Sequence, residues 1–273
     1  TMTEMTKTKK YAYFPGCSQE GSSAEYDEST RAVFGRFGVQ FEEIPDWTCC
    51  GSSSAHNINH ELGLALSMRN LALAEPQGMD IVTPCASCYN RLKVAETAVN
   101  EDPALRKKLG GIIEMDFTGK VSTLNTLDLI GEHLTPEAVA GKVVKKLTGL
   151  KAVCYYGCLT VRPPKMLKSG NPDNPMMMDD LLASLGAEPK FWAYKTDCCG
   201  AGHSVARSDI VRVLVGKLHE MAREAGADAI VTACPMCFTN VDMRQDAAKG
   251  DALPVFFFTE LLALAMGMDE VKG

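Results

Sequence analysis

The chain has 273 residues, of which 46% are hydrophobic and 23% charged, and this composition is typical of a globular protein with one large or two smaller domains. Its net charge of −6 argues against a generic nucleic-acid surface, because phosphate binding requires clustered Lys and Arg. The polar start of the chain contains no apolar signal-peptide core, and the apolar stretch Leu253–Met268 is too short to span a bilayer. We therefore expect a cytoplasmic protein without a membrane span.

The first half of the chain alternates strand and helix patterns. Strands are predicted at Tyr11–Phe14, Val39–Ile44 and Asp80–Thr83, and helices at Ala24–Phe37 and Glu61–Glu75. The last of these helices is amphipathic, since its leucines recur at helical spacing. A third helix is expected to complete this half.

The second half repeats the alternation. Strands are predicted at Lys151–Tyr155, Glu188–Ala193 and Ala229–Thr232, and helices at Met177–Leu185, Ser208–Ala225 and around Leu261–Met266. Alternating strands and helices favour an α/β protein with short, mainly parallel sheets flanked by helices. We expect two homologous half-domains, residues 1–140 and 141–273.

Eleven cysteines are the unusual feature of this composition. In a chain without an export signal, they indicate metal or redox chemistry rather than disulfides. Ten of them form two sets, and Cys154 stands apart on a predicted strand, where a buried packing role is expected. The first set is Cys17, Cys49, Cys50, Cys85 and Cys88, and the second is Cys158, Cys198, Cys199, Cys234 and Cys237.

The two sets are copies of one pattern. Each has a Gly-Cys, then a Cys-Cys-Gly and then a Cys-x-x-Cys, and from the double cysteine onward the copies are offset by 149 positions. This is an internal duplication. The first copy carries extra residues around Glu101–Phe117 and the second around Arg162–Asn174.

Every cysteine group follows a predicted strand. Because ligand sites in open α/β sheets lie beyond the carboxyl ends of the strands, three groups per half are expected to converge at one edge. The glycines beside them allow tight turns and a close approach of the backbone to a bulky cofactor.

Several chemistries use cysteine, and they differ in how many thiols they explain. A zinc ion takes four ligands, so a zinc site with a spare cysteine remains an alternative. Disulfides between adjacent cysteines are strained, and a Cys-x-x-Cys redox motif leaves three cysteines of each set unexplained. An iron–sulfur cluster explains more, and a fifth thiol indicates a cluster that is not a plain four-iron cubane.

The spacing of the cysteines resembles that of the cysteine-rich CCG domain. Two intact copies over nearly the whole chain resemble the B subunit of heterodisulfide reductase from methanogens and their relatives, as do Arg162-Pro163-Pro164-Lys165 and the segment 253–267. The resemblance implies two non-cubane [4Fe-4S] clusters, each bound by the five cysteines of one set.

The resemblance also implies a reaction and partners. The reaction is reduction of the mixed disulfide of coenzyme M and coenzyme B, which would sit between the clusters, each supplying one electron and capturing one sulfur. The partners are the ferredoxin-like C subunit and the flavoprotein A subunit of heterodisulfide reductase, with a hydrogenase or formate dehydrogenase in the larger assembly of methanogenesis. A non-catalytic electron-transfer module of a larger dehydrogenase complex, or a reductase of a different disulfide, remains the alternative.

Other side chains are candidates for a role in the site. His56, His60 and His203 follow the double cysteines and are candidate proton donors to a product thiolate, although a surface or capping role is the more common one for histidine. Arg162, Lys165 and Lys168 follow Cys158 and are candidates for binding the anionic groups of the substrate, against a purely solvated role.

Overall fold

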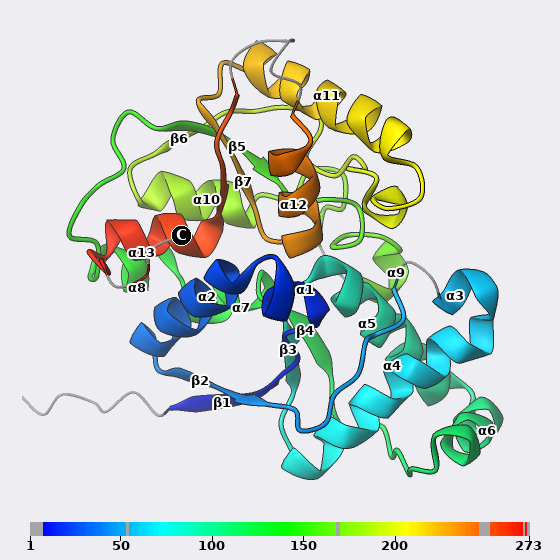
Figure 1. The fold of residues 1–273 in the computed structure, drawn as a ribbon. Coiled ribbons are helices and arrows are strands. Elements are labelled where there is room, and N and C mark those ends of the chain that lie inside the picture. The colour runs from blue at the N-terminus through cyan, green and yellow to red at the C-terminus, as the bar shows by residue number, and fades with distance from the viewer. Residues whose placement is uncertain (1–7, 53–54, 168–169, 246–251, 270, 272–273) are drawn as a thin grey trace, which may run out of the picture.

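The computed structural model describes residues 8–52, 55–167, 170–245, 252–269 and 271. It contains two four-stranded sheets in which every described strand pair is parallel (Figure 1). The first sheet has the order β2-β1-β3-β4 and the second the order β6-β5-β7-β8, so the two have the same topology. The strands are β1 (Lys9–Tyr13), β2 (Val39–Glu43), β3 (Ile81–Thr83), β4 (Thr123–Asn125), β5 (Lys151–Tyr155), β6 (Glu188–Pro189), β7 (Ala229–Thr232) and β8 (Val255–Phe257).

Helices cover the faces of both sheets. The central strands β3 and β7 are buried along their whole length, as expected where helices cover both faces of a parallel sheet. The helices of the first half are α1 (Cys17–Gly21), α2 (Ala24–Arg36), α3 (Ala55–Ile58), α4 (His60–Ala74), α5 (Ala86–Glu101), α6 (Pro103–Ile113), α7 (Asp128–His133) and α8 (Pro136–Ala140), with a 3-10 turn at Glu75–Gln77. Those of the second half are α9 (Pro164–Leu167), α10 (Met177–Ser184), α11 (Ser208–Glu224), α12 (Pro235–Met243) and α13 (Phe258–Ala265), with a 3-10 turn at Ala201–His203.

Local sequence sets several helix starts. Asn59 caps α4 by accepting a hydrogen bond from the backbone N–H of Leu62. Asp102 caps α6, and Pro103 follows it at the first helical position, where its missing N–H costs nothing. The extra residues of the first half therefore form a capped helix that has no counterpart among the described residues of the second half.

The predicted fold class is confirmed, with differences at individual elements. The fourth strand of each sheet, β4 or β8, was not predicted. The strand predicted at Glu188–Ala193 ends at Pro189, since the chain then turns and the Trp192 indole donates to the Cys154 carbonyl at 2.9 Å.

The two halves interlock rather than folding as separate bodies. Helix α2 of the first half packs on α13 of the second, and α10 of the second packs against α7 and α8 of the first (Figure 1). The Tyr26 ring stacks on Phe257 with centroids 4.0 Å apart, and its hydroxyl donates to the Ala233 carbonyl at 3.0 Å. Both hydrophobic cores contain residues of both halves. The division into residues 1–140 and 141–273 stays a prediction. Because the two halves share both hydrophobic cores, this division separates the two copies of the duplicated sequence rather than two independently packed domains.

None of the helices in the described ranges is long and apolar enough to cross a membrane.

Candidate cysteine site between the two halves

All ten cysteines of the two sets lie in segments that follow the carboxyl ends of strands. In the first half, Cys17 begins α1 after β1, and Cys85 immediately precedes α5 after β3. In the second half, Cys158 follows β5 and Cys234 immediately precedes α12 after β7. The double cysteines follow the outer strands β2 and β6. The parallel topology therefore brings three separate segments of each half to one edge.

Within each set the sulfur atoms approach one another. Cys50 Sγ lies 3.3 Å from Cys88 Sγ, and the matching pair, Cys199 Sγ and Cys237 Sγ, is 3.6 Å apart. Hydrogen bonding to the Cys158 thiol lowers the pKa of Cys198 to about 6, and the N–H of Gly200 also donates to this sulfur at 3.3 Å. In the first set, hydrogen bonding to the Cys17 thiol likewise lowers the pKa of Cys49.

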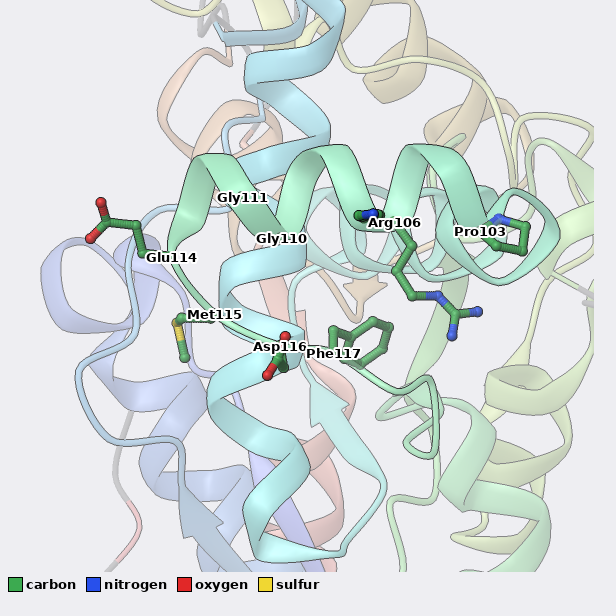
Figure 2. Close-up of a pocket in the computed structure, with 9 residues that line it drawn as sticks. Pro103, Arg106, Gly110, Gly111, Glu114, Met115, Asp116 and Phe117 are labelled. Carbon is green, nitrogen blue, oxygen red and sulfur yellow. The ribbon is translucent and has the colours of Figure 1, made fainter.

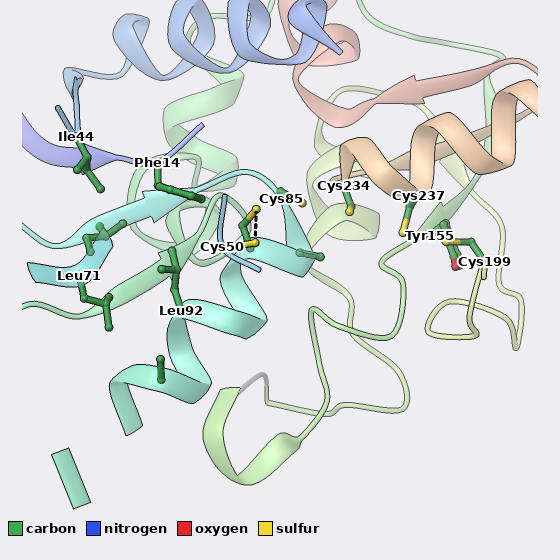
Figure 3. Packing of buried hydrophobic residues seen from close by; sticks show 14 of the residues in the cluster. Phe14, Ile44, Cys50, Leu71, Cys85, Leu92, Tyr155, Cys199, Cys234 and Cys237 are labelled. Atoms are coloured by element: carbon green, nitrogen blue, oxygen red, sulfur yellow. Dashed lines mark hydrogen bonds between the residues drawn. The ribbon is translucent and has the colours of Figure 1, made fainter. Parts of the chain in front are cut away.

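The two sets meet at Cys85 and Cys234. The hydrogen bond to the Cys234 thiol is the largest cause that raises the pKa of Cys85. The pKa of Cys234 is lowered by its hydrogen bonds to Cys237 and then to Cys85. Both side chains are buried, and Figure 3 shows them at the junction between the cysteines of the two halves. The ten thiols thus form one continuous region across the interface.

Two glycines keep the backbone close to the sulfur atoms. Gly16 has φ +77°, and a Cβ added there would lie 2.9 Å from Cys88 Sγ. Its counterpart Gly157 has φ +72°, and its Cβ would lie 2.9 Å from Cys237 Sγ. Glycine is the residue that adopts this left-handed conformation without strain and leaves the space beside the sulfur open.

The donor set fits a polynuclear iron–sulfur group. In the described part of the chain, no group of three or more His, Cys, Asp or Glu is already arranged to hold a metal ion. Five thiols exceed the four positions of a tetrahedral zinc site, whereas iron–sulfur clusters are held by several thiolates. Six of the ten cysteines are buried, and the backbone N–H of Gly200 donates to Cys198 Sγ, as N–H groups do to the sulfurs of such clusters.

A cavity of about 340 Å³ lies against the junction of the two sets. All second-set cysteines line it, and the first half contributes His56 from α3 and Arg91 from α5. Leu159 and Met236 add apolar surface. A separate hollow of about 420 Å³ lies along α6 (Figure 2), where its lining residues run from Pro103 to Phe117 and include no cysteine.

Comparison with known proteins gives the family. Residues 11–93 and 152–242 match the family described as the CCG cysteine-rich domain. The chain belongs to the CCG cysteine-rich domain family. The two matched segments contain the two cysteine sets, so the predicted duplication corresponds to two CCG copies.

Relatives of similar length support the resemblance to the B subunit of heterodisulfide reductase. The chain is 28% identical to the B subunit of the ferredoxin/F420H2-dependent CoB-CoM heterodisulfide reductase of Methanosarcina acetivorans, over 94% of this chain and 89% of that protein. It is 26% identical to a protein of Archaeoglobus profundus described as similar to the heterodisulfide reductase B subunit, over 96% and 92%. It is also 29% identical to the 8-methylmenaquinol:fumarate reductase membrane anchor subunit of Wolinella succinogenes, over 95% and 93%. The similar proteins thus carry names from two different reactions.

A solved structure shares the fold. A hypothetical protein from Helicobacter pylori superposes with a TM-score of 0.74 over 95% of this chain, at 12% identity. The chain spans 49% of that protein's length, and the likeness concerns the fold alone.

The CCG fold brings only some of the predicted residues to the cavity. His56 and His203 line it from opposite halves, whereas His60 begins α4 and is exposed outside the lining. The Nδ1 atom of His56 is buried and has no hydrogen-bond partner among the described residues.

The basic candidates lie elsewhere. Arg162 is exposed, donates to the Thr196 carbonyl at 3.1 Å and pairs with Asp173 at 3.3 Å, and neither it nor the exposed Lys165 lines the cavity. Lys168 lies outside the described residues. Cys154 is fully buried in β5, where burial raises the pKa of its thiol.

The sequence analysis missed Arg91. It lies three residues after Cys88 on α5, so the two side chains share one face of the helix. A helix predicted from the Cys-x-x-Cys onward would have placed Arg91 beside the sulfur atoms.

A buried ion pair behind the second CCG set was also missed. Lys195 Nζ lies 2.9 Å from Asp179 Oδ1, and the two side chains are only 2% and 4% exposed. The Tyr156 hydroxyl donates to Asp179 Oδ2 at 2.8 Å. The Lys195 carbonyl accepts from the N–H groups of Tyr156 and Gly157 at 2.8 and 3.1 Å. These bonds tie the segment before Cys158 to the segment before Cys198.

Proposed function

We propose that this chain is an iron–sulfur subunit of a multi-subunit reductase that holds two non-cubane [4Fe-4S] clusters. One cluster is proposed to bind to Cys17, Cys49, Cys50, Cys85 and Cys88, and the other to Cys158, Cys198, Cys199, Cys234 and Cys237. The observation that carries the proposal is the meeting of two equivalent five-thiol sets at Cys85 and Cys234, beside one cavity. The second set lines the cavity, and the first set adjoins the second through Cys85, so that two neighbouring redox centres would suit a two-electron reaction.

The proposed reaction is reduction of a mixed disulfide, of which the coenzyme M–coenzyme B disulfide is the leading candidate. Two electrons and two protons cleave one S–S bond and give two thiols. Each cluster, when bound, exchanges one electron at a time. The named relatives from Methanosarcina and Archaeoglobus support this reaction.

The chain itself would bind the substrate and supply protons. The apolar side chains of Leu159 and Met236 help to exclude water from the cavity. His56 and His203 face the same cavity from the two halves, and we propose that they deliver one proton to each product thiolate. The unpartnered His56 Nδ1 is a candidate position for such a proton.

The proposed partners follow from the resemblance to the B subunit of heterodisulfide reductase. They are the ferredoxin-like C subunit and the flavoprotein A subunit of heterodisulfide reductase, with a hydrogenase or formate dehydrogenase further upstream. A cytoplasmic location stays a prediction. A second candidate is a non-catalytic electron-transfer module, favoured by the similarity to the Wolinella fumarate reductase anchor subunit, which the chain matches over nearly its whole length.

One experiment separates these functions. The protein is purified without oxygen, its iron, acid-labile sulfide and zinc are measured, and electron paramagnetic resonance (EPR) spectra are recorded with 2-mercaptoethanesulfonate under oxidising conditions. About eight irons and eight sulfides per chain with a thiol-dependent signal support the disulfide reductase. The same iron content without a response to thiols supports the electron-transfer module, and zinc without sulfide contradicts both.

A further inference from the structure

Arg91 is the only Lys or Arg among the described residues that line the cavity. Its guanidinium is half-buried, and its Nε is buried without a hydrogen-bond partner among the described residues. Nη2 donates to Asn90 Oδ1 at 2.9 Å, and the described part of the chain offers Arg91 no carboxylate partner. A desolvated cation with an unused donor is costly unless an anion binds to it.

The second CCG copy has no such charge. Asn240 lies three residues after Cys237, as Arg91 lies three residues after Cys88, so the two positions correspond. The Asn240 amide is already used, because it donates to the Cys199 carbonyl at 3.3 Å and accepts from the Ser204 hydroxyl at 2.9 Å. The positive charge therefore lies on one side of a nearly twofold site.

We propose that Arg91 binds the acidic group of the substrate, and this inference rests on the disulfide reductase function proposed above. The ligand class is a thiol or disulfide that carries a carboxylate, sulfonate or phosphate a few bonds from sulfur. The planar guanidinium donates two parallel hydrogen bonds to such oxygens. A charge on one side only orients an unsymmetrical disulfide, so that the same sulfur always faces the same cysteine set.

The main rival role for Arg91 is to balance the negative charge of the first cysteine set. Burial lowers the pKa of Arg91, and Cys50 is the charged neighbour that opposes this effect. This role predicts loss of iron on substitution and no dependence on the charge of the ligand. The two roles can therefore be distinguished by measuring the iron content of the variants and the dependence of binding on the charge of the ligand.

The test compares two thiols that differ in one acidic group, 2-mercaptoethanesulfonate and the neutral 2-mercaptoethanol. Equilibrium dialysis with radiolabelled thiols gives each Kd for the anaerobically purified holoprotein, for Arg91→Gln and for Arg91→Lys. The matched control is Arg212→Gln, which changes an exposed arginine on α11. Iron and sulfide are counted in every variant.

We expect Arg91→Gln to weaken binding of the sulfonate about ten- to hundredfold, with binding of the neutral thiol and iron content unchanged. Arg91→Lys should keep part of the preference for the sulfonate over the neutral thiol, because lysine keeps the positive charge but lacks the paired donors of the guanidinium. Equal weakening of both thiols, or loss of iron, would overturn the assignment of Arg91 while leaving the reductase proposal intact. If the wild-type holoprotein binds neither thiol, the reductase proposal itself fails and this inference falls with it.

Discussion

The two CCG copies agree closely at the sulfur atoms and differ in what surrounds them. Both sheets have the same strand order, and the paired sulfurs are 3.3 Å apart in one copy and 3.6 Å in the other. Each copy places one positive-φ glycine directly beside a cysteine sulfur. The two copies therefore share the same arrangement of backbone and thiols around the proposed cofactor position.

The surrounding side chains are not repeated. Arg91 corresponds to Asn240, and Phe14, three residues before Cys17, corresponds to Tyr155, three before Cys158 (Figure 3). Among the described residues, a buried ion pair like Lys195–Asp179 lies behind the cysteines of the second copy only. The comparison teaches that the duplicated backbone sets the cofactor geometry, whereas single unrepeated side chains set charge and orientation.

The largest expected effect comes from breaking the ion pair of the second copy. Lys195→Met leaves Asp179 charged and buried, and we expect a loss of about 3–5 kcal/mol in the free energy of unfolding. Denaturant unfolding under anaerobic conditions measures it. The double variant Lys195→Met with Asp179→Leu removes both charges and should recover most of the loss.

Lys10→Met is the control for this pair, since Lys10 pairs with Glu42 on the surface. We expect it to leave the denaturation midpoint nearly unchanged. If Lys195→Met lowered the free energy of unfolding as little as Lys10→Met, the buried ion pair would not stabilise the second copy.

The next prediction tests whether each cysteine set binds its cluster independently of the other set. Gly16→Ala and Gly157→Ala each add a Cβ that would lie 2.9 Å from a sulfur. We expect each variant to lose the cluster of its own copy and to retain about half of the wild-type iron and sulfide.

Gly38→Ala is the matched control, because Gly38 also has a positive φ, +78°, but its added Cβ meets nothing within 4 Å. It should keep its full iron content despite similar backbone strain. Equal iron loss in all three variants would mean that strain alone, and not the space beside the sulfur, causes the loss.

Much of this arrangement could be predicted from the sequence. The strands at 151–155 and 229–232 match the prediction, because short runs of β-branched and aromatic residues between turn signals define buried strands. The edge at which the cysteines gather followed from parallel topology alone.

Other features depend on contacts between distant segments. A third helix was expected in the first half, but the bounds of α5 were not predicted, because it buries polar residues such as Asn90 and Glu96 together with its apolar ones, and this masks its periodicity. The packing of α2 on α13 joins segments more than 200 positions apart. The burial of Lys195 could not be predicted, because lysine is rarely buried without a partner and its partner Asp179 lies 16 positions away.

A smaller effect is expected at the aromatic position of the second copy. The Tyr155 hydroxyl donates to the Asp197 carbonyl at 2.7 Å, just before the double cysteine, and Phe14 has no hydroxyl to do this. Tyr155→Phe should lower the free energy of unfolding by about 1 kcal/mol. It should also change the EPR signal of the second set only, whereas a change in both signals would contradict the local role of this bond.

The smallest expected effect distinguishes Arg162 from Arg91. Arg162 also lies close in sequence to a cysteine, but its guanidinium is bound to the Thr196 carbonyl and Asp173 and does not line the cavity. We therefore expect Arg162→Gln to leave the Kd for 2-mercaptoethanesulfonate within about twofold of wild type, since exposed ion pairs contribute little. A loss as large as that of Arg91→Gln would show that the loop after Cys158 closes over the substrate. In that case the anion would be held by the second copy as well as the first, and the charge asymmetry between the two copies would no longer explain how an unsymmetrical disulfide is oriented.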